Sequence, residues 1–238
     1  MFPQLRHLDP KLWVLSALLD APHPKLRRFA RVRHANRVKS WMPKPDIRKI
    51  VAGLPESTVV IDFGANAGLI TRALAVRARV VHAVEADPDI FAVLKENCAD
   101  LDNVVLHHFA ISDRSGEAIF HRESDAVQID RTNTPDCGTL HQNHSRVAGA
   151  GATIKTPVMG IEEFLRQIDE PVDFIKMDIE GAEVEVLEAL FDSPYMERIG
   201  QISVETHEFW LPETADRMLA LRRRARSFNR PEIDFNWR

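Results

Sequence analysis

From residue 58 onward, short apolar runs alternate with segments of helical periodicity, and this alternation restricts the fold more than any other feature. Amphipathic stretches such as AEVEVLEALF (182–191) separate the apolar runs. Strands that alternate with helices are typical of βαβ units, so we predict an α/β fold with a mostly parallel sheet and helices on both faces. The runs most typical of buried strands are TVVIDFG (58–64), RVVHAVEA (79–86), NVVLHHFA (103–110), VDFIKMDI (172–179) and IGQISVETH (199–207).

The first part of the chain differs in charge. Residues 1–50 hold twelve Lys and Arg against three Asp, about +9, which leaves about −13 for the rest of a chain whose net charge is −4. Proline interrupts this part repeatedly, so we predict a basic N-terminal helical segment over 1–50 and a main domain over 51–238, with a polar lid loop at about 121–152. We interpret the basic segment as helices packed on an acidic body, or as an edge that helps to hold an anionic or carrier-linked substrate.

Several classes of protein are disfavoured by composition. The negative net charge and the lack of an aromatic and basic platform argue against nucleic acid as a partner. Cys98 and Cys137 have no spacing typical of zinc sites or disulfide frameworks. The longest early apolar stretch, LWVLSALL (12–19), is too short to span a membrane. We therefore expect a cytoplasmic protein without a membrane span, and a homo-oligomer remains open.

A glycine-rich turn follows the first predicted strand: Asp62-Phe63-Gly64-Ala65-Asn66-Ala67-Gly68. Glycine lets the backbone adopt left-handed conformations and approach a ligand closely. The turn lacks the G-x-G-x-x-G spacing of dinucleotide sites, and the acid at its start would repel a pyrophosphate. An acid there would attract an ammonium group such as that of S-adenosylmethionine (SAM), and Glu85, at the end of the second strand, is placed to bind ribose hydroxyls.

The motifs VVIDFGANAGLIT, VVHAVEADPDIFAVLKEN, AISDRSGEAIF, FIKMDIEGAEVEVLEAL and ISVETH resemble the FkbM-type SAM-dependent methyltransferases. The resemblance covers roughly residues 45–210, and KMDIEGAE (176–183) is its most specific part. It implies a class I (Rossmann-like) methyltransferase fold with strand order 3-2-1-4-5-7-6 and O-methylation of sugars or secondary metabolites. The end of the chain is short for the last hairpin of such a sheet, so we expect the sheet to be shortened there.

The same resemblance implies a set of cofactor-binding residues. The turn residues would hold the methionine part of SAM, Glu85 with Ala86 the ribose, and the stretch after the third strand the adenine. The full set is Asp62, Gly64, Asn66, Gly68, Glu85, Ala86, Phe109, Ala110 and Asp113.

Histidines of the predicted lid are candidates for the base that activates a hydroxyl acceptor. His141 and His144 stand in CGTLHQNHSR, and His121 begins the same loop. We prefer His144 and then His141, while the alternative is that all three are exposed loop residues. Asp178, at the end of the fourth main strand, is a further catalytic candidate.

Asp178 and Glu205 end neighbouring strands of the implied sheet, and His207 follows two residues later. Together they could hold Mg²⁺ or Mn²⁺ through oxygen ligands, with His207 at the margin. In the alternative interpretation, Asp178 binds the amino group of SAM and backbone amides satisfy Glu205. Glu180 and Glu183 are interpreted as structural, because they start a helix and favour its dipole.

The predicted function is therefore SAM-dependent O-methylation of a carbohydrate hydroxyl, on a small-molecule or oligosaccharide acceptor. Two alternatives stay open: an O-methyltransferase of a polyketide or other secondary metabolite, and a SAM-binding protein without catalysis.

Overall fold

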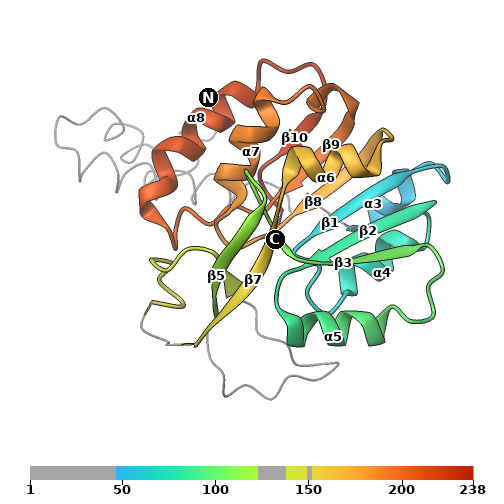
Figure 1. Cartoon of the computed structure of the whole chain (residues 1–238). Coiled ribbons are helices and arrows are strands. Elements are labelled where there is room, and N and C mark those ends of the chain that lie inside the picture. The colour runs from blue at the N-terminus through green and yellow to red at the C-terminus, as the bar shows by residue number, and fades with distance from the viewer. Residues whose placement is uncertain (1–46, 123–137, 149–151, 238) are drawn as a thin grey trace, which may run out of the picture.

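The computed structural model describes residues 47–122, 138–148 and 152–237, and Figure 1 shows their arrangement. Six parallel strands form the main sheet in the order β10-β9-β8-β1-β2-β3. This confirms the predicted α/β class. Their bounds are β1 Val59–Phe63, β2 Val80–Glu85, β3 Val104–His108, β8 Val172–Met177, β9 Ile199–Val204 and β10 Glu232–Asp234.

The far edge of the sheet differs from the strand order that the resemblance implies. There β10 pairs in parallel with β9, so one strand stands where a hairpin was implied. The order from β3 to β9 agrees with the prediction, and it places the ends of β1, β2 and β8 side by side.

Helices cover both faces of the sheet because the strands are apolar on both sides. Val59, Ile61 and Phe63 of β1 pack toward α6 and α7, whereas Val60 packs with the cluster of α3 and α4. Helix α5 packs on the sheet through Leu94, which shares a further apolar cluster with Ala83 of β2. The helices are α3 Ile47–Gly53, α4 Leu69–Ala75, α5 Pro88–Asn97, α6 Ile161–Ile168, α7 Glu183–Asp192 and α8 Ala215–Ala225.

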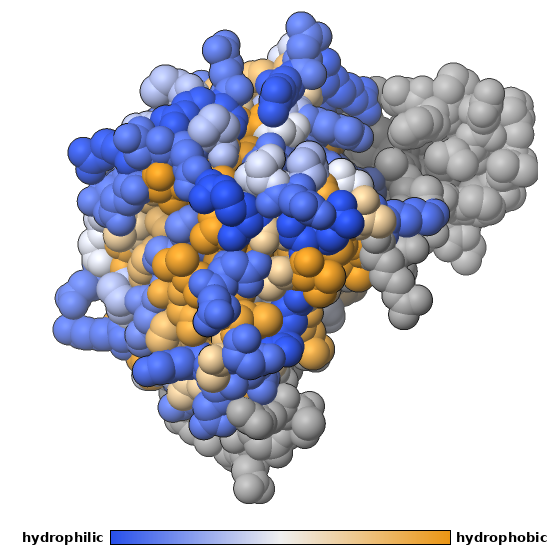
Figure 2. All heavy atoms as spheres, turned by 90° about the vertical axis from the view of Figure 1, so that its right-hand side faces the viewer, coloured by the Kyte–Doolittle hydropathy of each residue, from blue (hydrophilic) through white to orange (hydrophobic). Residues whose placement is uncertain are grey.

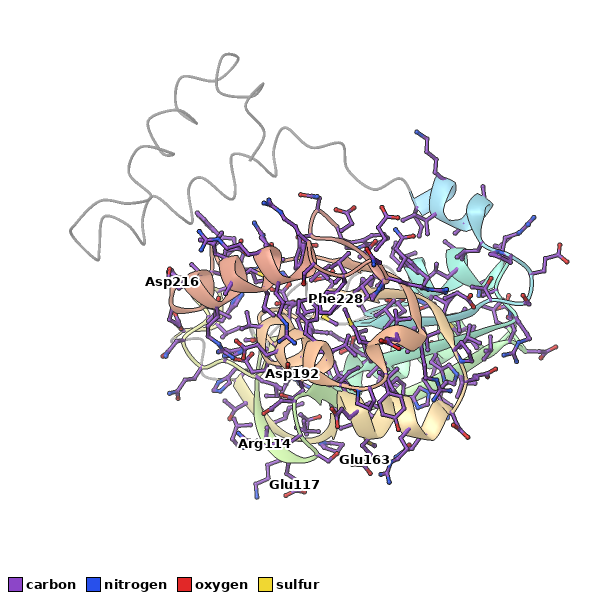
Figure 3. The ribbon with its side chains drawn as sticks, turned by 90° about the horizontal axis from the view of Figure 1, so that it is seen from above. Arg114, Glu117, Glu163, Asp192, Asp216 and Phe228 are labelled. Atoms are coloured by element: carbon purple, nitrogen blue, oxygen red, sulfur yellow. The ribbon has the colours of Figure 1, made fainter. Side chains whose placement is uncertain are left out.

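The helix α3 crosses the boundary that the sequence suggested between residues 50 and 51. Its residues Ile47, Ile50 and Val51 pack against the core beneath α4. On the opposite face, α8 lies along α7, and the side chains between them are visible from above in Figure 3. There the ring of Phe228 meets that of Phe191 edge-on at 5.0 Å.

A second, smaller sheet adjoins the ends of the main strands (Figure 1). Its order is β4-β7-β5-β6, with bounds Ala110–Ser112, Ala152–Gly160, Gly116–Arg122 and Gly138–Thr139 respectively. The apolar run 103–110, expected to be one strand, is divided at Phe109: β3 belongs to the main sheet and β4 to the small one. The small sheet therefore begins directly at the end of a main-sheet strand.

Two histidines form a pair between β2 and β3. Nδ1 of His82 lies 3.0 Å from Nε2 of His107, and their rings stack at 5.3 Å. The ring of His107 also meets Phe164 of α6 edge-on. Burial lowers the pKa of His107 to about 4, and the pKa of His82 is lowered as well, again chiefly by burial. The pair therefore favours its uncharged form in the folded protein.

Figure 2 looks onto the side of the molecule that carries β3, α4 and α5, where apolar side chains gather between charged ones. On or next to these elements, Leu69, Val76 and Val105 are exposed large apolar residues. Within the described residues, no helix has the length and apolar character needed to cross a bilayer.

Candidate functional site

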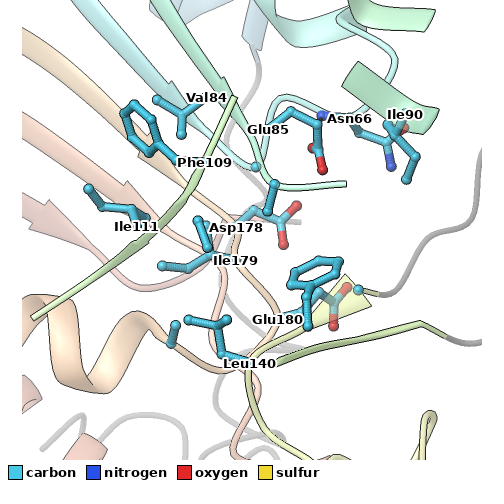
Figure 4. Close-up of a pocket in the computed structure, with 16 residues that line it drawn as sticks. Asn66, Val84, Glu85, Ile90, Phe109, Ile111, Leu140, Asp178, Ile179 and Glu180 are labelled. Carbon is cyan, nitrogen blue, oxygen red and sulfur yellow. Dashed lines mark hydrogen bonds between the residues drawn. The ribbon is translucent and has the colours of Figure 1, made fainter. Parts of the chain in front are cut away.

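A pocket lies where the ends of β1, β2 and β8 meet the small sheet (Figure 4). Asn66 and Glu85 line one end, Glu180 and Leu140 line the other, and Asp178 lies between them. Ligands of open α/β sheets bind beyond the carboxyl ends of the strands, so this is the expected place for a cofactor.

The glycine-rich turn forms one wall of the pocket. Gly64 and Asn66 line it, with φ of 74° and 48°. A β-carbon on Gly64 would lie 1.8 Å from the backbone oxygen of Asp178, so the end of β8 abuts the turn directly. Glycine is required here by both the left-handed backbone and this contact. Gly68 also has a left-handed φ of 86°, but its α-carbon faces Leu94 and Cys98, and it does not line the pocket.

Glu85 is buried at the end of β2, the strand end at which the sequence placed it. Its Oε2 accepts a hydrogen bond from the backbone N–H of Asn66 and its Oε1 from that of Asp87, each at 2.9 Å. Burial raises the pKa of this carboxyl to about 7, although both amide contacts act in the opposite direction. Each oxygen has a second lone pair that can accept from a ribose hydroxyl.

Apolar side chains line much of the rest of the pocket. Val84, Ile90, Phe109 and Ile111 line it, together with Ala86 and Ala110. A flat, largely apolar ring such as adenine suits this lining. Asp113 is exposed beyond β4 beside Arg114 and does not line the pocket, so it stands apart from the other predicted adenine residues.

Asp62 is placed differently from the prediction. It is fully buried and does not line the pocket, and its Oδ2 accepts from the hydroxyl of Thr71 at 2.7 Å. Its Oδ1 lies 3.2 Å from Nζ of Lys176, which also donates to the backbone oxygen of Gly64 at 2.7 Å. Asp62 therefore already has a protein cation as its partner.

Lys176 is a residue that sequence reasoning missed. Burial by itself would lower its pKa, but Asp62 and Asp178 outweigh that effect and raise it. Its Nζ lies 3.7 Å from Oδ2 of Asp178. This ammonium supports the turn from behind and holds the two carboxylates in place.

Asp178, Glu180 and His207 form a cluster that begins at the middle of the pocket and continues to the end that Glu180 lines. One ligand atom of each lies within 4.8 Å of the others, as a metal site would require. Nε2 of His207 lies 3.7 Å from Oδ1 of Asp178 and 3.4 Å from Oε2 of Glu180. Its Nδ1 lies 2.9 Å from Oε1 of the buried Glu183. The contact to Glu183 orients the imidazole so that Nε2 faces the two carboxylates.

The electrostatics of this cluster are strongly perturbed. Burial would lower the pKa of His207, yet Glu183, Glu180 and Asp178 together raise it to about 10. Burial raises the pKa of Glu180 to about 7 even though His207 acts in the opposite direction. At neutral pH, His207 is therefore an imidazolium, and Glu180 is divided between its protonated and deprotonated forms.

Glu205 lies outside this cluster. Its backbone N–H donates to the carbonyl of Met177 at 2.8 Å, which continues the pairing of β9 with β8, and its side chain is half-buried. Glu180 takes the place that the prediction gave to Glu205. The motif KMDIEGAE, which includes Lys176, Asp178, Glu180 and Glu183, was the signal that could have identified these residues.

The predicted catalytic histidines lie behind and beside the pocket. His144 is fully buried with Nε2 3.4 Å from Oε2 of Glu180, and burial, with His207 and Arg146, lowers its pKa to about 4. His141 lies 3.4 Å from Glu185, whose carboxylate raises the pKa of His141. Neither imidazole lines the pocket, whereas Asp178 does. The lid residues 123–137 and 149–151 lie outside the described residues.

The small sheet is fastened to the pocket walls at three points. Thr156 of β7 donates to the carbonyl of Ala86 at 3.0 Å, and Thr139 of β6 donates to that of Glu180 at 2.6 Å. Arg122 at the end of β5 lies 2.7 Å from Asp87, the N-cap residue of α5. The small sheet thus closes one side of the pocket.

Comparisons with known proteins show which family this chain resembles. The sequence profile described as "Methyltransferase FkbM domain" matches residues 62–228. The 2-O-methyltransferase NoeI of Sinorhizobium fredii is 26% identical over 189 residues, which are 74% of this chain and 73% of that protein. Ribosomal RNA small subunit methyltransferase A of Rubrobacter xylanophilus is 43% identical over 60 residues, but the chain spans only 23% of its length. A crystal structure of methyltransferase FkbM from Methylobacillus flagellatus aligns with 91% of this chain and 53% of that one, at 14% identity and a TM-score of 0.46.

Proposed function

Because the chain belongs to the FkbM methyltransferase family, we propose that it transfers the methyl group of SAM to a hydroxyl of a carbohydrate. The observation that carries this proposal is the polarity of the pocket, with a ribose-type acid, Glu85, at one end and the cluster of Asp178, Glu180 and His207 at the other. The apolar side chains that line the rest of the pocket suit adenine.

The chain's residues fit the cofactor in three regions. Glu85 would hold the ribose, with Ala86 beside it, and the backbone of Gly64 and Asn66 would face the methionine part. Phe109 and Ala110 would cover the adenine. We assign Asp62 and Gly68 to support of the turn, since neither lines the pocket. When bound, SAM supplies a methyl group on a positively charged sulfur, and the carboxylates at that end of the pocket complement this charge.

We assign the base to Glu180. It lines the pocket, and its pKa of about 7 matches the working pH of a general base. Oε1 or Oε2 of Glu180 would take the proton of the acceptor hydroxyl as the oxygen attacks. Asp178, held by Lys176 and His207, would orient the acceptor by accepting a second hydrogen bond. His144 stands behind Glu180 as a positioning residue, and His141 has no role in proton transfer here.

A divalent cation is the second candidate for this cluster, favoured by the 4.8 Å grouping of its three ligand atoms. Asp178, Glu180 and His207 would be the protein ligands, with Glu183 orienting the imidazole. Because one of these three ligands is an imidazole and not a carboxylate, the set favours Mn²⁺ over Mg²⁺. The ion would lower the pKa of the acceptor hydroxyl. It would also have to displace the proton from Nε2 of His207, whose pKa is about 10.

Two observations support an oxygen acceptor of carbohydrate type. The relative NoeI is by name a 2-O-methyltransferase. The segment beyond the acid end of the pocket presents His141, Gln142 and Asn143, side chains that form hydrogen bonds with hydroxyl groups. A polyketide acceptor would require a larger apolar surface there.

Release of S-adenosylhomocysteine tests the proposal directly. The full-length chain is incubated with SAM and a panel of mannosides, rhamnosides and macrolide aglycones, and methylated products are located by mass spectrometry. We expect turnover with glycosides and none with aglycones. Turnover with aglycones alone would transfer the function to secondary metabolites, and SAM binding without any turnover would indicate a protein that binds the cofactor only.

A further inference from the structure

A second recess adjoins the cofactor pocket and shares Leu140 with it. It lies between β5, the segment that follows β6 and the short 3-10 helix η3, Pro212–Thr214. Leu140 stands at the acid end of the pocket, near Glu180 (Figure 4). This recess, which we call the outer recess, is therefore next to the end of the pocket that Glu180 lines. Its lining residues are Ala118, Ile119, His121, Leu140, His141, Gln142, Asn143 and Glu213.

The polar side of the outer recess consists mainly of uncharged hydrogen-bonding groups. Gln142 and Asn143 are exposed, and their amides have no hydrogen-bond partner within the described ranges 47–122, 138–148 and 152–237. Each amide offers two N–H donors and one carbonyl acceptor, and the ring of His121 adds a further nitrogen. Such mixed donors and acceptors suit hydroxyl groups, which both donate and accept.

The charge of the recess argues against an anionic ligand. Among its described lining residues there is no Lys or Arg, the side chains that bind phosphate most often. Glu213 adds a negative charge, and the imidazole of His141 is paired with Glu185. A phosphorylated or carboxylated group would be repelled there, whereas a neutral polyol would not.

The other side of the recess is apolar. Ala118, Ile119 and Leu140 form it, and the side chain of Ile119 is 46% exposed although it belongs to a strand. A pyranose ring has hydroxyl groups at its edge and C–H groups on its faces. An apolar wall opposite a row of amides matches both parts of such a ring.

We propose that the outer recess binds the glycosyl residue next to the one that is methylated, so that the acceptor is a disaccharide or longer saccharide. This inference rests on the proposed function, because it takes the acceptor to be a carbohydrate. Gln142 and Asn143 bind the hydroxyls of the neighbouring residue, and Ile119 contacts its C–H face. The recess thereby determines acceptor length, while Glu180 acts on the methylated residue.

Steady-state kinetics of matched acceptors test the proposal. Methyl glycosides of mannose and rhamnose are compared with the corresponding disaccharides for the wild type and the variant Gln142→Ala/Asn143→Ala. We expect a lower KM for the disaccharide in the wild type. The variant should raise that KM about ten- to a hundredfold through loss of two or more hydrogen bonds, and leave the methyl glycoside unchanged. The kcat and the Kd for SAM should stay within about twofold.

A matched control replaces the same residue types at exposed positions elsewhere, Gln167→Ala/Asn229→Ala. It should leave all constants unchanged. Ile119→Glu provides a second probe, since a carboxylate on the apolar wall should raise the KM for the disaccharide alone. Equal KM values for both acceptor lengths in every variant would overturn the outer recess as a glycosyl site and leave the proposed function standing. Absence of turnover with every saccharide would overturn both.

Discussion

Nδ1 of His207 lies 2.9 Å from Oε1 of Glu183, and this contact determines which nitrogen of the imidazole faces the pocket. Glu183 is itself held by the backbone N–H groups of Ile179 and Gly181, at 2.9 and 3.0 Å. The turn that carries Glu180 is therefore fixed to the same carboxylate that orients His207. One buried side chain, Glu183, therefore fixes both the orientation of the His207 imidazole and the geometry of the turn.

Glu183→Gln should separate these two roles. The amide keeps the size of the side chain but loses its charge, so the pKa of His207 should fall, and kcat should fall about ten- to a hundredfold. NMR titration of the His207 ring protons and steady-state kinetics measure the two effects. Glu188→Gln, on the same helix but paired with Arg217 and not with His207, is the control. An unchanged His207 titration would show that Glu183 does not control this imidazole.

Glu180→Gln should remove the base. We expect kcat to fall on the order of 10²- to 10⁴-fold with the Kd for SAM nearly unchanged. In the wild type, the base must be deprotonated, so kcat should rise with pH through about 7, the raised pKa of Glu180. The residual kcat of Glu180→Gln should not show this rise with pH. Its persistence there would assign the ionisation to another group.

Asp62→Asn should mainly affect stability. Loss of its charge leaves the buried Lys176 without its nearest carboxylate, which costs about 3 to 5 kcal/mol when a buried pair is broken. Glu85→Ala, in contrast, should weaken SAM binding about ten- to a thousandfold through loss of charge-assisted hydrogen bonds. Urea denaturation and calorimetry with SAM separate the two variants. If Asp62→Asn weakened SAM binding while its free energy of unfolding stayed nearly unchanged, this acid would instead be assigned to the cofactor.

The pair of His82 and His107 should make the fold sensitive to acid. The folded-state pKa of His107 is lowered from 6.5 to about 4, so the unfolded chain binds a proton more readily between these values. The free energy of unfolding should therefore fall as the pH drops from about 6.5 toward 4. His107→Phe, which can keep the edge contact with Phe164, should reduce this fall. Urea midpoints at pH 7 and 5 measure it, with the exposed His108→Phe as control; equal pH dependence in both variants would contradict the prediction.

A chelator separates the two arrangements proposed for the acid cluster. The His207 imidazolium already supplies a positive charge beside Asp178 and Glu180, so we expect full turnover in EDTA. Loss of turnover in EDTA, with recovery in Mn²⁺ greater than in Mg²⁺, would instead establish the metal centre. In that case, Asp178→Asn should raise the metal concentration needed for half activity.

The main sheet could be predicted from the sequence because its central strands are apolar on both faces and end in turn residues. The division of the run 103–110 at Phe109 could not, because no glycine, proline or charge marks the place where the chain changes sheets. The pairing of Asp62 with Lys176 was equally hidden, since it depends on the register of β1 against β8.

The site was predicted in part for the same physical reasons. Glu85 could be located because it ends a strand, and position along a parallel strand determines which rim a residue occupies. Glu180 has a left-handed backbone with φ of 51°, and no sequence pattern indicates that such a turn directs a side chain into a pocket. The preference for His144 failed to anticipate its complete burial, because a loop sequence does not reveal which of its residues face inward.

The change of sheet at Phe109 has a consequence for how such an enzyme can diversify. Residues that line the proposed cofactor pocket belong mostly to the main sheet and its turns, whereas the outer recess is built from β5 and the segments that follow β6 and β9. Substitutions at the positions that line only the outer recess, such as Ala118, Ile119 and His121 of β5, can therefore accumulate without disturbing the parallel strands beneath. A lineage could exchange one acceptor for another through these segments alone while inheriting the cofactor chemistry unaltered.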